Sequence, residues 1–75
     1  MKIDRILNVN GKVCPMPAAL TRKMLKQMGS HETIEIVGDF DPALVNVVNM
    51  ITKNKAKVLE QEKSNNYFRV LAEKM

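Results

Sequence analysis

The chain alternates between short β-rich segments and two longer stretches of helical periodicity, and this order constrains its fold most. From about Pro15 to Met28, apolar residues recur every three or four positions, with basic residues on the opposite face. Gly29 suits the left-handed position that closes such a helix. A second helix is expected after Asp41-Pro42, where Asp41 is the predicted cap and Pro42 the first helical residue. The apolar stripes are Pro17, Leu20, Met24 and Met28 in the first helix, and Leu44, Val47, Val48 and Ile51 in the second.

Four further segments have the composition of strands. They cover residues 3–9, 33–37, 56–62 and 67–72, with the last two joined by a turn over 63–66. A strand, helix, strand crossover makes its strands parallel, whereas a hairpin is antiparallel. The sequence therefore predicts an α+β fold of order βαβαββ, a two-layer sandwich with two helices on one face of a mixed four-stranded sheet. In the last strand, Phe68, Val70 and Ala72 are expected to face the core.

The length of 75 residues leaves room for one core, so we expect a single domain over 1–75. No apolar run approaches the roughly 20 residues that span a membrane, and the charged start lacks the apolar region of a signal peptide. A single cysteine forms no internal disulfide, which fits a reducing compartment. A cytoplasmic monomer without membrane contact is therefore expected.

The composition also disfavours several classes of site. One cysteine and one histidine fall short of the three or four ligands of a zinc site, so neither metal nor cofactor is expected. The formal net charge of +4 admits an acidic partner, either a protein or a nucleic acid. Because aromatic residues make up only 4% of the chain, direct nucleic-acid binding is disfavoured. His31 is expected about 20 Å from Cys14, at the far end of the first helix, which argues against a Cys-His dyad.

Cys14 is the best candidate for chemistry. It directly precedes the first helix, within Gly11-Lys12-Val13-Cys14-Pro15-Met16-Pro17. Unpaired backbone N–H groups and the positive end of the helix dipole favour a thiolate, and Lys12 adds a nearby positive charge, so we expect the thiol pKa to lie below its ordinary value of about 8.5. Pro15 and Pro17 are tolerated in the first helical turn and stiffen it. The alternative is that Cys14 is a small buried apolar residue.

Several neighbours of Cys14 are candidates for supporting roles. The backbone N–H groups of Met16 and Ala18 are the remaining free donors of the first turn and are candidates to point at the sulfur. The Met16 side chain is a candidate apolar contact for partners. Arg22, Lys23 and Lys26 form either a solvated helix face or a docking surface for acidic proteins.

The segment 11–17, followed by Arg22-Lys23 and by Asp39-Phe40-Asp41-Pro42, resembles the small sulfur-carrier family that includes TusA and its SirA-like and YedF-like relatives. The resemblance covers the whole chain in length and element order. Only the Cys-Pro-x-Pro segment is specific to this family. It implies the βαβαββ sandwich of the C-terminal domain of bacterial translation initiation factor 3. It also implies that Cys14 carries sulfane sulfur as a persulfide, in a loop shaped by Pro15 and Pro17.

The same resemblance implies the partners. They are a sulfur donor, such as a cysteine desulfurase or a rhodanese-like protein, and an acceptor protein in tRNA thiolation, molybdenum-cofactor synthesis or sulfur metabolism. Such a carrier acts with partner enzymes and does not turn over alone. Two other classes stay open. One is a non-catalytic RNA-binding or protein-binding regulatory module, and the other is a thiol redox protein that takes its resolving thiol from a second chain.

Overall fold

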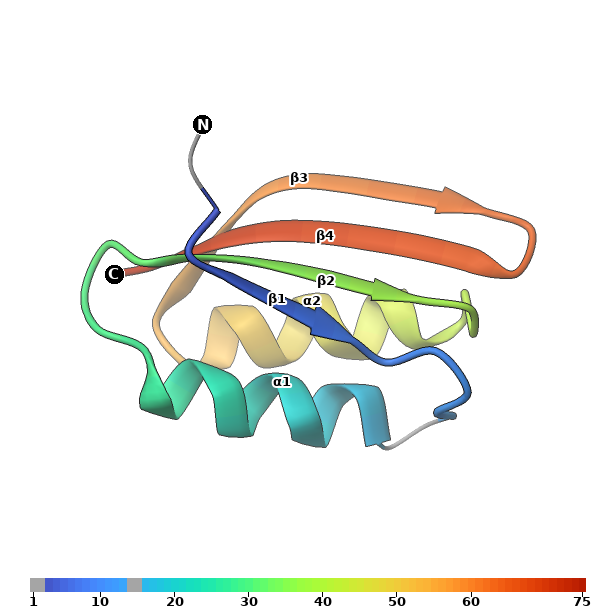
Figure 1. Ribbon diagram of the computed structural model, residues 1–75, viewed down its shortest axis with the longest axis horizontal. Helices are drawn as coiled ribbons and strands as arrows, with labels where there is room; N and C mark the ends of the chain where they lie inside the picture. Colours follow the sequence, from blue (N-terminus) through green and yellow to red (C-terminus); the bar gives the residue numbers. More distant parts are fainter. Residues whose placement is uncertain (1–2, 14–15) are drawn as a thin grey trace.

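The computed structural model describes residues 3–13 and 16–75 and has the predicted order βαβαββ (Figure 1). Its elements are β1 (Arg5–Asn8), α1 (Met16–Gln27), β2 (Thr33–Gly38), α2 (Ala43–Lys53), β3 (Ala56–Ser64) and β4 (Tyr67–Lys74). Helix α1 begins at Met16, and the predicted helix start at about Pro15, directly after Cys14, falls outside the described residues.

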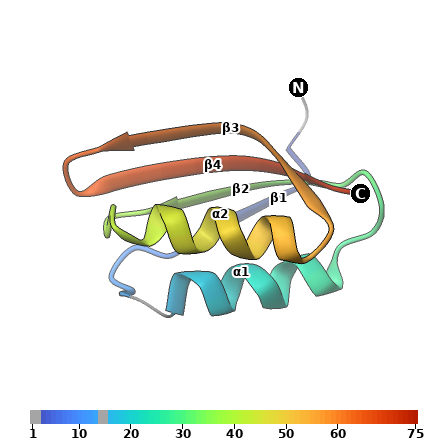
Figure 2. The same ribbon diagram turned by 180° about the vertical axis from the view of Figure 1, so that it is seen from behind.

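The sheet has the order β1-β2-β4-β3. Strands β1 and β2 are parallel, while β4 pairs with β2 and β3 in antiparallel fashion. Both helices lie on one face of the sheet, as Figures 1 and 2 show from opposite sides. The predicted two-layer α+β sandwich with a mixed sheet is confirmed. Because β1 and β2 are parallel and each is followed by a helix, α1 and α2 start at the same end of the molecule.

The buried face of α1 differs from the predicted stripe. Its buried residues are Pro17, Ala18, Thr21 and Leu25, followed by Met28 just beyond the helix. Leu20 and Met24 are only partly buried at the margin of the core. The buried Thr21 was missed because a hydroxyl is counted as polar, yet this one donates a hydrogen bond to the Pro17 carbonyl at 2.8 Å and so costs little to bury.

The end of α1 also differs from the expectation. The helix stops at Gln27, and in the loop that follows the positive φ angle, 68°, belongs to His31 and not to Gly29. The Gly29 N–H donates to the Glu32 carboxylate at 2.8 Å, and the Glu32 N–H donates to the Gly29 carbonyl at 3.3 Å. These reciprocal bonds hold the loop without a left-handed glycine.

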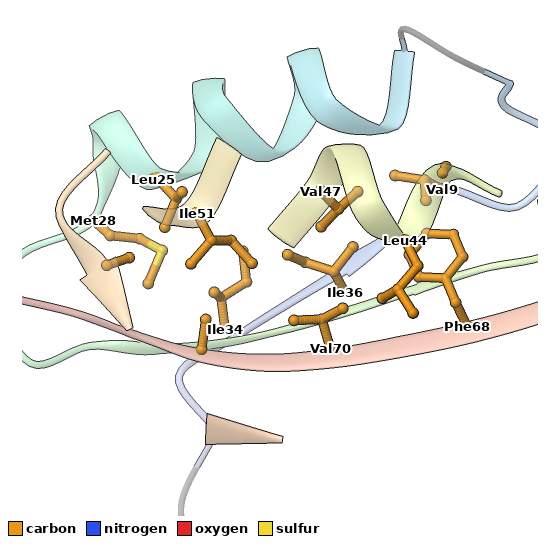
Figure 3. Packing of buried hydrophobic residues seen from close by; sticks show 13 residues of the cluster. Val9, Leu25, Met28, Ile34, Ile36, Leu44, Val47, Ile51, Phe68 and Val70 are labelled. Carbon is orange, nitrogen blue, oxygen red and sulfur yellow. The ribbon is translucent and has the colours of Figure 1, made fainter. Parts of the chain in front are cut away.

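The core lies between the helices and the sheet (Figure 3). Phe68, Val70 and Ala72 are fully buried, which confirms the predicted inward face of β4. They pack with side chains from every other element or its flanks, among them Val9, Leu25, Ile34, Ile36, Leu44, Val47, Ile51 and Ala56. At roughly 25 cal/mol per Å² of buried apolar surface, this cluster is the main source of stability.

The open face of the sheet carries an ionic cluster centred on Arg69. The guanidinium contacts the carboxylates of Glu35 at 2.5 Å, Glu62 at 3.2 Å and Glu60 at 3.6 Å. The hydrogen bond to Glu35, more than the surrounding negative charge, raises the pKa of Arg69 above its ordinary value. In the strand register Glu35 and Glu60 flank Leu71, which is only 3% exposed although it faces away from the helices. The cluster therefore borders this apolar residue on both sides.

Candidate functional site at the amino ends of the helices

Two loops meet at the end of the molecule where both helices start. The first leads from β1 toward Cys14, and the second leads from β2 to α2 (Figure 1). Loops that follow parallel strands gather at one edge of a sheet, where binding sites are common. Here they are joined directly, because the Gly11 N–H donates to the Asp39 carboxylate at 2.9 Å.

The loop before Cys14 is a defined turn. The Lys12 N–H donates to the Val9 carbonyl at 3.0 Å, and Gly11 has a φ of 81°, as the third residue of a type II turn requires. The Asn8 side chain accepts the Asn10 N–H at 2.8 Å, while the Val9 N–H donates to Val37 in β2 at 2.8 Å. The sheet and this turn therefore fix the chain as far as Lys12.

The described residues on either side of Cys14 expose apolar surface. The side chains of Val13 and Met16 are 56% and 45% exposed, whereas Pro17 is fully buried. Cys14 itself lies outside the described residues. The sulfur is therefore attached to a loop whose two described flanks are accessible to a partner, with Pro17 anchored in the core.

The donor arrangement proposed for the sulfur needs a correction. The Met16 N–H donates to the Val13 carbonyl at 2.9 Å, so the expectation that it points at the Cys14 sulfur is wrong. The Val13 carbonyl, three residues earlier in the chain, already accepts this N–H, so the N–H is not free to bind the sulfur.

The two aspartates of the second loop contribute different groups, Asp41 its backbone carbonyl and Asp39 its carboxylate. Pro42 is the N-cap residue of α2 and carries no side-chain cap, so the predicted cap at the Asp41 side chain is wrong. Asp41 contributes its backbone carbonyl, which accepts the Leu44 N–H at 3.1 Å, and Phe40 does the same for Ala43 at 3.0 Å. Asp39, which directly follows β2, is the residue whose carboxylate joins the two loops.

Replacing Asp39 with alanine should loosen the loop that carries Cys14. One exposed hydrogen bond to a carboxylate contributes about 1 kcal/mol, so amide exchange at Gly11 is expected to accelerate roughly fivefold. Asp39→Asn, which keeps the acceptor oxygen, should change the exchange much less. Hydrogen exchange followed by NMR measures both, and equal rates in the two variants would show that the carboxylate oxygen does not restrain this loop.

Positive charge gathers on the helical layer. Neither α1 nor α2 contains an acidic residue, and their four basic residues are Arg22, Lys23, Lys26 and Lys53. The rest of the chain has eight basic and eight acidic residues, so the formal net charge of +4 resides on the two helices. Lys12, Arg22, Lys23 and Lys26 are all exposed. Lys12, in the loop toward Cys14, adds a further cation at the end where both helices start.

The histidine lies away from the start of α1, and the described residues form neither a metal site nor a membrane-spanning helix. His31 follows the opposite end of α1 from Met16, about 18 Å away along the helix axis, and contacts Glu73 at 3.9 Å. Within residues 3–13 and 16–75, no group of three His, Cys, Asp or Glu side chains is placed to hold a metal ion. In the same part of the chain, no helix is long and apolar enough to cross a membrane.

The fold and the sequence together define a class: a small βαβαββ sandwich whose one cysteine lies in the chain between the first strand and the first helix. Residues 5–74 match the family model described as sulfurtransferase TusA. The chain therefore belongs to the TusA family. This match confirms the family resemblance drawn from the Cys-Pro-x-Pro segment.

Two relatives share the name "Putative sulfur carrier protein". The one from Methanocaldococcus jannaschii is 35% identical over 68 residues, covering 91% of each chain. The one from Archaeoglobus fulgidus is 29% identical over 63 residues, covering 84% of this chain and 72% of the relative. Among solved structures, the SirA-like protein from Desulfitobacterium hafniense superposes with a TM-score of 0.71 at 24% identity, covering 92% of this chain and 95% of that one. That likeness bears out the fold.

Proposed function

We propose that the protein is a sulfur carrier that accepts sulfane sulfur as a persulfide on Cys14 and passes it to an acceptor protein. The observation that carries this proposal is the Cys-Pro-x-Pro segment within the family match over residues 5–74. The exposed flanks of Cys14 support it, because a carrier must reach two different proteins with the same sulfur.

The transfer consists of two displacements at sulfur. In the first, the Cys14 thiolate attacks the outer sulfur of a donor persulfide. A bond forms between Cys14 Sγ and that sulfur, while the bond to the donor's inner sulfur breaks and its electron pair leaves with the donor as a thiolate. In the second, an acceptor thiolate attacks the same outer sulfur and Cys14 leaves as a thiolate. One S–S bond is exchanged for another in each step, so no oxidant or reductant is consumed.

The residues around Cys14 serve this chemistry in separate ways. Lys12 favours the thiolate by its charge, and the buried Pro17 fixes where the loop meets α1. Val13 and Met16 offer apolar contact area to a partner. The donor is proposed to be a cysteine desulfurase or a rhodanese-like protein.

The test is mass spectrometry of the purified protein after incubation with sodium polysulfide, and separately with a cysteine desulfurase and cysteine. A mass gain of one sulfur atom that maps to the peptide containing Cys14 and disappears on reduction is the expected result. Failure of every donor to leave such an adduct would reject sulfur carriage.

Charge reversal on α1 should slow exchange with a protein donor. The double variant Arg22→Glu/Lys23→Glu is expected to lower the rate of sulfur transfer from a desulfurase roughly tenfold at low salt, because steering by complementary charge acts mainly on association. The transfer rate should also depend less on ionic strength, while loading from polysulfide stays unchanged.

The matched control for that variant is Lys57→Glu/Lys63→Glu, which makes the same change in net charge on the exposed side chains of β3. If both double variants slow transfer equally, the effect comes from net charge, and Arg22 and Lys23 are no docking site.

A further inference from the structure

A groove of about 280 Å³ lies between the two helices, lined by Ala18, Asn46, Asn49, Met50 and Lys53. The α2 side chains in this lining are spaced by three and four residues, so they share one face of that helix. Ala18 lies in the first turn of α1, four residues after Cys14 in the chain. The groove therefore reaches the first turn of α1 at Ala18 and extends along α2 as far as its last residue, Lys53.

The groove is lined by one cation, Lys53, and by no acidic side chain of either helix. Arg22 and Lys26 follow Ala18 by four and eight residues, which places them on the same face of α1. Lys53 contributes to the lining from α2. Both helices lack acidic residues, so an anion in the groove meets no repulsion from them.

The lining chemistry points to a carboxylate on a short aliphatic stem. The Lys53 ammonium and the Asn49 amide are donors for carboxylate oxygens, and Met50 and Ala18 provide apolar surface for methylene groups. The volume falls just below the range of pockets that enclose drug-sized ligands, which suits one or two side chains. Neither helix has an aromatic residue on which a nucleobase would stack, which disfavours a nucleic acid.

We propose that this groove receives an aspartate or glutamate side chain from an exposed segment of the protein that exchanges sulfur with Cys14. The nature of that partner rests on the proposed function, whereas the affinity of the groove for a carboxylate does not. A side chain seated between α1 and α2 would hold the partner against the helix that follows the cysteine segment, which would restrict the positions that the partner's sulfur can take relative to Cys14.

The experiment titrates ¹⁵N-labelled Cys14→Ser protein with an amidated, acetylated hexapeptide rich in glutamate, followed by NMR. Saturable shifts are expected at Ala18, Asn49 and Lys53, with smaller shifts for the peptide in which glutamine replaces glutamate. Asn49→Phe, which fills the groove without changing charge, and Lys53→Glu should each weaken binding at least fivefold. Lys63→Glu, the same charge change on the exposed part of β3, should leave it close to that of the Cys14→Ser protein.

Equal shifts at lysines of β3, or unchanged binding in the Asn49→Phe protein, would overturn the proposal. So would an absence of saturable shifts in the groove. Because the protein in this titration cannot carry sulfur, its outcome is independent of sulfur carriage. A failure of polysulfide to load wild-type Cys14 would instead reject the proposed function and leave the carboxylate site standing.

Discussion

Replacing Cys14 with serine is expected to abolish sulfur loading from polysulfide and from a desulfurase alike. A serine hydroxyl is almost wholly protonated at neutral pH and forms no persulfide, and the chain has no second cysteine to substitute for it. Mass spectrometry should therefore show no reducible gain of sulfur. The thermal midpoint should stay within a few degrees of wild type, because the described residues on either side of Cys14 are exposed.

The same variant separates the competing classes of function. If the protein binds RNA through its basic surface alone, Cys14→Ser should shift tRNA in a gel as strongly as wild type at physiological salt. If it is a thiol redox protein, oxidant should leave wild type with a sulfenic acid or an intermolecular disulfide, and no donor should leave a persulfide. Sulfur carriage predicts a persulfide on wild type, none on the variant, and no tRNA shift by either.

Replacing Gly38 with alanine should cost the protein a large part of its stability. An added Cβ at Gly38 would lie 2.5 Å from Cε2 and 2.8 Å from Cζ of the Phe68 ring, and 2.8 Å from Cγ2 of Val9. Both neighbours are fully buried, so neither can swing away into solvent. Overpacking of this kind costs about 1–3 kcal/mol, against a total of roughly 5–15 kcal/mol for a small domain. Urea unfolding measures the loss directly.

Two further variants test whether this cost arises from crowding. Gly29→Ala is the matched control, because a Cβ there would meet only the Glu32 carboxylate at 4.0 Å, and its free energy of unfolding should change by less than about 0.5 kcal/mol. In a Phe68→Leu background, which removes the ring, Gly38→Ala should cost less than half as much. Equal costs with and without the ring would rule out the contact with Phe68 as the cause.

The fold was predictable because its elements differ in periodicity. Two helical stripes, four β-rich segments and a hairpin turn leave little choice of topology once right-handed crossovers are assumed. The side of α1 that is buried was less predictable, because Thr21 and Leu25 alternate with Leu20 and Met24 along adjoining stripes. Which stripe faces the sheet depends on how the helix packs, and composition alone does not decide that.

The sequence points to the candidate site through the Cys-Pro-x-Pro segment, from which the roles of Cys14, Lys12 and the prolines stay predictions. The contacts around that segment were less predictable. Asp39 was missed because its partner, Gly11, is 28 residues away and comes close only when β1 and β2 pair in parallel. Asp41 was assigned a cap by its place before Pro42, but α2 starts one residue later than assumed. The Gly11–Asp39 contact and the exact start of α2 depend on how the elements pack in three dimensions, which local sequence patterns do not reveal.

The segregation of charge onto the helices gives the molecule an electric dipole moment directed from the sheet toward the helical layer. In the field of an acidic protein, a diffusing copy experiences a torque as well as an attraction, over about one Debye length, roughly 8 Å in physiological salt. It would arrive with its helices foremost. Since the cysteine loop is joined to the amino end of α1 in that layer, orientation before contact would shorten the search for a productive encounter.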